Sequence, residues 1–215
     1  MHLKRYEVPK KWPIARKGSV YIARPNSNLN GGIPLLVILR DVLKIAQNKK
    51  EAKEAIHSKN ILVNARHAND EKQAVLLFDT MTNIPAKKSY RLEIADNGKF
   101  DLKEINEDES RKKIAKILDK KIQKKNKMQI NLSDGRNFIS DMKCNVNDSI
   151  LVDLKNKAAE KCVPLRENAN AVVFDGKHAG KSGKIKKINA EHKTAEIDIK
   201  GKSVSVLLRQ IIVTE

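Results

Sequence analysis

The residues that first suggest chemistry lie in the loop DGKHAGKSGK at residues 175–184. Its Gly180, Lys181 and Ser182 copy the end of the motif GxxxxGKS, in which backbone N–H groups and a lysine hold nucleotide phosphates. The motif needs its first glycine at position 175, where this chain has Asp175. The segment KIKKI that follows is typical of a strand, whereas a phosphate-binding loop leads into a helix. The loop therefore does not predict nucleotide hydrolysis.

Other sequence patterns typical of catalytic or metal sites are absent. The five histidines are scattered, with no HxH or HxxxH pair and no neighbouring cysteine, so they do not form a set of zinc ligands. Cys144 and Cys162 lie 18 positions apart without a CxxC motif, which excludes a disulfide framework and indicates inert thiols. The acidic patch at residues 104–109 has no histidine near it and favours a solvated helix start over a metal site. We expect no enzyme activity, no metal and no cofactor.

The net charge of the chain indicates the kind of partner that it binds. Of the 215 residues, 44 are Lys or Arg and 26 are Asp or Glu, which gives a net charge of +18. Solubility requires only about 2 to 8 charges in a small domain, so this excess favours a polyanion such as nucleic acid. The chain has one Trp, three Tyr and four Phe, and several of these must serve its cores. We therefore expect recognition of folded RNA through backbone and shape more than through base stacking.

Membrane association is not favoured. The longest apolar stretch, residues 33–39, has seven residues and contains Pro34, whereas a membrane-spanning helix needs about 20. The first residues are basic but are not followed by the apolar core and cleavage site of a secretory signal. The sequence predicts an intracellular protein with neither a membrane nor a small-molecule partner.

The cations must be positioned by the elements that hold them, and the first segment is residues 1–33. It has seven cations, one acid, several prolines and glycines and no sustained apolar period, which predicts a basic arm that orders only against its partner. PLLVILRDVLKIAQ, from Pro34, predicts a helix whose polar stripe holds Arg40, Lys44 and Gln47. A second helix, KKEAKEAIHSK, follows the N-cap Asn48.

The remainder of the chain is typical of strands. ILVNARHAND, AVLLFD and SYRLEIA predict strands and turns up to residue 95. Residues 111–127 carry nine cations and one acid and fit a helix or a helix that passes into a strand, so this boundary stays open. SILVDL and KCVPL indicate a central β-rich module. Five short β-branched runs in the last 45 residues predict a small barrel.

Several segments in order along the chain resemble the archaeal and eukaryotic small-subunit ribosomal protein family S-four-e (S4e). They are HLKR at residues 2–5, KW at 11–12, ARP at 23–25, PLLVILRDVLK at 34–44, VNDSILVDL at 146–154 and the closing IIV after LLRQ. The resemblance implies a structural constituent of the small ribosomal subunit that binds ribosomal RNA beside neighbouring ribosomal proteins in the cytoplasm and serves translation. Eukaryotic members continue past the last module with a basic extension, whereas this chain ends at Glu215, so we expect the archaeal form.

The resemblance also implies the fold class, which is α+β with several modules. After the basic N-terminal arm at residues 1–33, an α-L RNA-binding domain would occupy 34–95, a central β-rich domain 96–168 and a KOW barrel of SH3-like type 169–215. The glycines at positions 176, 180 and 183 would let the barrel's loop approach RNA, although they could equally serve only to provide positive φ in a long hairpin.

The expected RNA contacts are cations of the arm, of the helix pair with its following turn, and of the barrel loop. They are Lys4, Arg5, Lys10, Lys11, Arg16, Arg24, Arg40, Lys44, Lys49, Lys50, Lys53, Arg66, Lys177, Lys181 and Lys184.

Two other classes of protein are compatible with the same modules. One is an RNA-modifying enzyme that borrows the α-L module, as some pseudouridine synthases do, although little chain is left for a catalytic domain. The other is a translation or transcription factor that docks on another protein through the KOW barrel, which predicts exposed apolar patches there.

Overall fold

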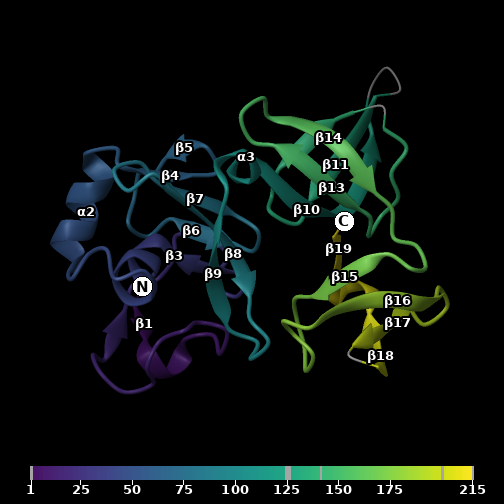
Figure 1. Cartoon of the computed structure of the whole chain (residues 1–215), viewed down its shortest axis with the longest axis horizontal. Coiled ribbons are helices and arrows are strands. Elements are labelled where there is room, and N and C mark those ends of the chain that lie inside the picture. Colours follow the sequence, from purple (N-terminus) through teal and green to yellow (C-terminus); the bar gives the residue numbers. More distant parts are fainter. Residues whose placement is uncertain (1, 124–126, 141, 200, 215) are drawn as a thin grey trace. The chain divides into compact units, whose positions relative to one another are not determined.

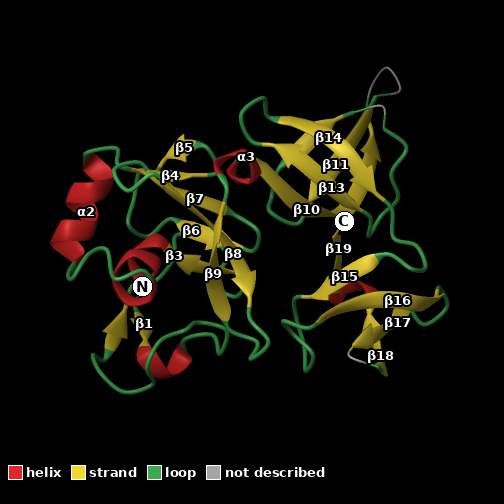
Figure 2. Ribbon diagram, in the orientation of Figure 1, coloured by secondary structure: helices red, strands yellow, loops and turns green. Residues whose placement is uncertain are grey.

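The computed structural model describes residues 2–123, 127–140, 142–199 and 201–214. The chain divides into two compact units, one of Met1–Ala95 with Lys99–Arg111 and one of Asp96–Gly98 with Lys112–Glu215 (Figure 1). Both units consist mostly of antiparallel strands, with few and short helices (Figure 2). Among the described residues, no helix has the length and apolar character required to cross a membrane.

The N-terminal segment is folded, which corrects the expectation of an arm that orders only against a partner. Strands β1 (Leu3–Lys4) and β2 (Tyr21–Ile22) pair, and a single 3₁₀ turn, η1 (Arg5–Glu7), follows β1. Trp12 is only 2% exposed, and its indole Nε1 donates a hydrogen bond to the Gly32 carbonyl oxygen at 3.0 Å. A few isolated apolar side chains anchor the segment, so the absence of an apolar period does not imply disorder.

The first predicted helix is much shorter than expected. Pro34 ends strand β3 (Gly32–Pro34) in an extended conformation, and only α1 (Leu35–Val37) and the π-helical turn η2 (Ile38–Val42) follow. Lys44 then takes a positive φ of 54°. Every residue from Ile33 to Leu39 is buried, so packing on all sides, rather than on one helical face, determines this segment. The predicted stripe of Arg40, Lys44 and Gln47 on one helix is wrong.

The second predicted helix is confirmed as α2 (Lys49–His57). The Asn48 side-chain oxygen accepts hydrogen bonds from the backbone N–H groups of Lys50 at 2.8 Å and Glu51 at 3.0 Å. The Glu51 carboxylate accepts the Gln47 N–H at 2.7 Å. Together they satisfy donors that a helix start leaves unpaired. Ala52 and Ile56 face the core.

The sheet of the first unit has the order β5-β4-β7-β8-β9. Its strands are β4 (Ile61–Val63), β5 (Arg66–His67), β7 (Thr80–Asn83), β8 (Lys88–Ile94) and β9 (Phe100–Ile105), while β6 (Ala74–Leu76) pairs with β3. Three acids of the acidic patch, Glu107, Asp108 and Glu109, begin the short helix α3 (Glu107–Ser110), as the sequence indicated, whereas Glu104 lies in β9. Its Glu109 forms an ion pair with Arg91 at 3.3 Å.

The first sheet of the second unit has the order β12-β11-β10-β13-β14. Its strands are β10 (Lys112–Ile122), β11 (Met128–Leu132), β12 (Asn137–Ile139), β13 (Ser149–Asp153) and β14 (Ala158–Val163). The lysine-rich segment 111–127 is therefore a strand over 112–122, and its helical alternative is wrong; residues 124–126 lie outside the described part. β10 pairs with β13 through its first half and with β11 through its second. This central position between two partner strands favours its isoleucines in a β conformation.

The second sheet of this unit contains the five strands predicted near the C-terminus. The order is β18-β17-β16-β15-β19, formed by β15 (Asn170–Val173), β16 (Ser182–Asn189), β17 (Thr194–Ile199), β18 (Lys202–Leu207) and β19 (Ile211–Thr214). A 3₁₀ turn, η4 (Leu208–Gln210), precedes β19. Val173, Ile185, Ile197 and Val213 are central in its core.

Candidate nucleic-acid interface

The cations of the N-terminal segment divide into structural and exposed groups. The Arg5 guanidinium donates to the carbonyl oxygens of Ala15 at 2.6 Å and Ser19 at 2.7 Å, and to the Ser19 hydroxyl at 2.8 Å. Arg5 therefore holds the loop between β1 and β2 in place, and its charge is not cancelled because these acceptors are neutral. Lys4, Lys10 and Arg16 are exposed, whereas Lys11 and Arg24 are half-buried.

Two cations after β3 do not form the expected pair. The Arg40 guanidinium is held by its neighbour Asp41, with Nε to Oδ1 at 3.0 Å and Nη2 to Oδ2 at 2.8 Å. This hydrogen-bonded carboxylate raises the pKa of Arg40 and neutralises its charge. Lys44 is exposed in the turn after η2. Lys44 is therefore better placed than Arg40 for a phosphate contact.

The three lysines at the start of α2 are all exposed but differ in their partners. The Glu71 side chain is only 9% exposed, and its Oε1 lies 3.1 Å from the Lys49 ammonium and 3.9 Å from that of Lys53. These two lysines compensate a nearly buried carboxylate. Lys50 is exposed and forms no ion pair with the described residues. Sequence reasoning missed Glu71, because nothing in its local pattern marks it as a partner of α2.

Arg66 is exposed on β5, at the edge of the sheet of the first unit. An edge strand leaves one row of backbone groups unpaired, so a cation there is open to a partner.

The loop before β16 is structurally unlike a phosphate-binding loop. The Gly180 N–H donates to the Val173 carbonyl at 2.8 Å and the Lys181 N–H to the His178 carbonyl at 3.2 Å, so these N–H groups are used within the loop. The strand β16 then begins at Ser182, which confirms the strand expected after the loop. Gly183 has a packing role, because a Cβ there would collide with the Asp198 carbonyl oxygen.

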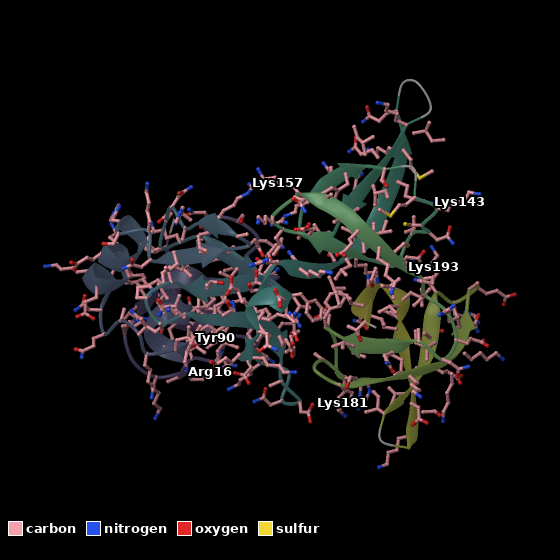
Figure 3. All side chains as sticks on the ribbon, turned by 45° about the horizontal axis from the view of Figure 1, so that its top comes forward. Arg16, Tyr90, Lys143, Lys157, Lys181 and Lys193 are labelled. Carbon is pink, nitrogen blue, oxygen red and sulfur yellow. The ribbon has the colours of Figure 1, made fainter. Side chains whose placement is uncertain are left out.

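The cations of this loop differ in exposure. Lys177 and Lys184 are exposed, and Lys181 is half-buried. Figure 3 shows further exposed cations of the second unit, at Lys143, Lys157 and Lys193, and Arg16 in the first. Exposed cations therefore occur on both units.

Three lysines of the basic segment in β10 are directed into the protein instead. Lys113 is 2% exposed in its side chain and contacts Asp134, itself 5% exposed, at 2.8 Å. The Lys116 ammonium donates to the carbonyl oxygens of Leu208 and Ile211. Lys120 donates to the Cys144 carbonyl oxygen. The segment therefore presents fewer positive charges at the surface than its number of lysines indicates.

Burial changes the acidity of two groups in the second unit. It lowers the pKa of Lys116 to about 8. Burial, with contributions from Cys144 and Asp148, raises the pKa of the Cys162 thiol to about 12, and Cys144 is buried. A thiol with so high a pKa stays protonated at neutral pH and is a poor nucleophile. Within residues 2–123, 127–140, 142–199 and 201–214, no three His, Cys, Asp or Glu side chains gather as metal ligands.

These features define a basic, mostly β protein whose exposed cations suit an RNA phosphate backbone. Residues 86–159 match the model described as Ribosomal family S4e, and residues 1–27 match the RS4NT (NUC023) domain. The small ribosomal subunit protein eS4 of Methanocella arvoryzae is 33% identical over 197 residues, which cover 90% of this chain and 83% of that protein. The eS4 protein of Archaeoglobus fulgidus is 34% identical over 188 residues, with 86% and 79% covered. The chain belongs to the ribosomal protein family S4e.

A solved structure shows the same fold. The crystal structure of the 30S ribosomal protein S4e from Thermoplasma acidophilum matches with a TM-score of 0.75 at 24% identity. The match covers 86% of this chain and 95% of that one.

Proposed function

We propose that this chain is a structural constituent of the small ribosomal subunit, which binds and stabilises folded ribosomal RNA and catalyses no reaction. The observation that carries the proposal is the similarity, over 90% of the chain, to a protein named for the small ribosomal subunit. A net charge of +18 and exposed cations on both units support it. Its partners would be ribosomal RNA and neighbouring ribosomal proteins, in the cytoplasm.

The modules expected from the sequence remain part of this proposal. Residues 34–95, with α2 and the turn between β4 and β5, would act as an α-L RNA-binding domain, and residues 96–168 as a central β-rich domain. The sheet of residues 169–215 would act as a KOW module of SH3-like type. Its last strand β19 returns to pair with its first strand β15 after the 3₁₀ turn η4, which suits a small barrel.

The exposure and the partners of these cations divide the proposed RNA contacts into three groups. Exposed cations without a described ion pair are the better candidates: Lys4, Lys10, Arg16, Lys44, Lys50, Arg66, Lys177 and Lys184. Lys11, Arg24 and Lys181 are half-buried candidates, and Arg5, Arg40, Lys49 and Lys53 also have structural partners.

Sedimentation of a native extract tests the proposed function. We expect the chain to travel with the small subunit in a sucrose gradient and to remain there after a high-salt wash that removes loosely bound factors. A chain found only at the top of the gradient would contradict the proposal. If the chain travels with the small subunit before the wash but not after it, the chain is a dissociable factor instead.

A further inference from the structure

Two tyrosines of the N-terminal segment are exposed to solvent although aromatic side chains usually bury most of their surface. Tyr6 is 71% exposed and Tyr21 is 57% exposed. The pairing of β1 with β2 places Lys4 opposite Tyr21, while Leu3 on the other face is buried. The two rings therefore lie on the solvent-exposed side of a small folded element. The other side of this element is packed into the protein through Leu3.

Each ring has one close neighbour that is a cation or another ring. The Lys4 ammonium lies 5.8 Å from the centroid of the Tyr6 ring, and the His2 ring centroid lies 5.3 Å from that of Tyr21. We call His2, Lys4, Tyr6 and Tyr21 the tyrosine patch. The segment around it, residues 1–33, has seven cations and one acid. This positive charge favours a polyanionic partner for the patch over a protein surface that carries little negative charge.

The backbone beneath the patch is fixed by hydrogen bonds. The Arg5 N–H donates to the Val20 carbonyl at 2.8 Å, and its guanidinium bonds to Ala15 and Ser19 hold the connecting loop. A backbone held in this way loses little conformational entropy when a ligand packs on the rings that it carries.

A small cavity lies beside Arg5. Its volume is about 100 Å³, and four cations border it among apolar residues: the lining is Arg5, Lys10, Arg16 and Lys99 with Val8, Pro9, Trp12, Ile14 and Ala15. Arg5 directly precedes Tyr6 in η1, so this cavity and the tyrosine patch share one support. The arginine and lysine side chains at its border can donate charge-assisted hydrogen bonds to a phosphate group.

We propose that the tyrosine patch stacks on an unpaired base of RNA, while the adjacent cavity holds a phosphate of the same strand. Aromatic platforms beside cations are the means by which proteins hold single-stranded nucleic acid. The inference rests on the proposed function and deepens it, because it assigns to the N-terminal segment an unpaired stretch rather than a helical one. Sequence composition alone had favoured backbone contacts over stacking.

The test compares two double variants of the full chain. Tyr6→Leu with Tyr21→Leu removes both rings, whereas Tyr6→Phe with Tyr21→Phe keeps them and removes only the hydroxyl groups. The probes are fluorescein-labelled oligoadenylate of about 12 nucleotides, an RNA duplex of the same length, and deproteinised small-subunit ribosomal RNA. Binding is followed by fluorescence anisotropy at several salt concentrations.

We expect the leucine variant to bind oligoadenylate about 5- to 150-fold more weakly, which is the range for one stacked base. The phenylalanine variant and binding to the duplex should stay within about twofold of wild type, since stacking needs only the ring. The salt dependence should not change, because no charge is removed.

Several outcomes would overturn the inference. They are unchanged oligoadenylate binding by the leucine variant, an equal loss on strand and duplex, and an equal loss in the phenylalanine variant. Wild-type protein that binds ribosomal RNA but not oligoadenylate would overturn it while leaving the proposed function intact. Failure of the proposed function would look different from failure of this inference. The wild-type protein would then bind none of the three RNAs and would not sediment with the small subunit. Loss of the leucine variant from subunits, with oligoadenylate binding unchanged, would assign the patch to a protein partner instead.

Discussion

The Lys116 ammonium donates a hydrogen bond to the main-chain carbonyl oxygen of Ile211 at 2.9 Å, across 95 positions of sequence. The same group also donates to the Leu208 carbonyl oxygen. A second bond joins the same two sheets, from the Val213 N–H to the Ser149 hydroxyl at 3.0 Å. A buried lysine of β10 thus joins the central sheet to the turn before the last strand.

The lowered pKa of Lys116 predicts that the stability of the fold depends on pH. Burial lowers its pKa to about 8 from the ordinary value of 10.5, so between these values the unfolded chain binds more protons than the folded chain. The contribution of Lys116 to the free energy of unfolding therefore rises with pH from about 8 to about 10.5. Urea titrations across this range should show the rise.

The control for this prediction is Lys116→Met, which keeps most of the length of the side chain but cannot titrate. The variant should be less stable at every pH, because the buried Ile211 carbonyl oxygen loses a donor, at about 1–3 kcal/mol, and the half-buried Leu208 carbonyl oxygen loses the same donor. Its rise in stability above pH 8 should be smaller than that of wild type. Identical pH profiles would show that Lys116 does not titrate in this range.

The contacts of Glu71 predict different effects for neighbouring lysines of α2. Lys49→Ala with Lys53→Ala leaves the Glu71 carboxylate without either compensating cation, and we expect a loss of about 1–2 kcal/mol of stability, between the values for exposed and buried pairs. Lys50→Ala should leave stability unchanged, since alanine favours helix, and should weaken RNA binding. Thermal unfolding and RNA titration separate the two effects.

Glu71→Gln supplies the control for this pair of variants. Added to the Lys49 and Lys53 changes, it removes the uncompensated charge and should restore part of the lost stability. A triple variant no more stable than the double variant would show that the lysines support the fold by packing and not by charge.

The pair Lys113 and Asp134 forms an internal charge site in the second unit. Burial by itself raises the pKa of Asp134, but the charge and hydrogen bond of Lys113, with smaller contributions from Arg136, lower it overall. Asp134→Ala removes the nearly buried carboxylate that contacts the buried Lys113 ammonium and should cost about 3–5 kcal/mol. Lys113→Met with Asp134→Leu removes both charges and should cost much less, because no buried charge remains. Chemical denaturation of both variants measures the difference.

Features that depend on a few adjacent residues were predicted well from sequence. The N-cap Asn48 and the strands β15 to β19 are examples, because the cap bonds only to the first turn and each strand follows from a short apolar run next to turn residues. The strand-forming part of the lysine-rich segment could not be settled, because its isoleucines fit both periods and the neighbouring strands β11 and β13 decide between them.

Features that depend on distant contacts were not predicted. Lys49 and Lys113 look alike in the sequence, yet one faces solvent beside Glu71 and the other is buried with Asp134. A lysine becomes structural when a carboxylate far along the chain packs against it, and neither charge density nor periodicity reports this. The exposure of Tyr6 and Tyr21 is equally a result of tertiary packing. The proposed RNA contacts therefore depend on the structure to separate free cations from paired ones.

Trp12 is the only tryptophan of the chain, so its fluorescence reports whether the N-terminal segment is folded before RNA binds. Trp12 is buried and bonded to the Gly32 carbonyl, so the free protein should show blue-shifted emission that iodide quenches weakly. Limited proteolysis of free protein should spare residues 2–33. Trp12→Ala should cost about 3–5 kcal/mol and expose the segment to protease, whereas Trp12→Phe should retain most of the protection. Red-shifted, readily quenched emission from the free protein, changing only when RNA is added, would restore the disordered arm and remove the fixed support beneath Tyr6 and Tyr21.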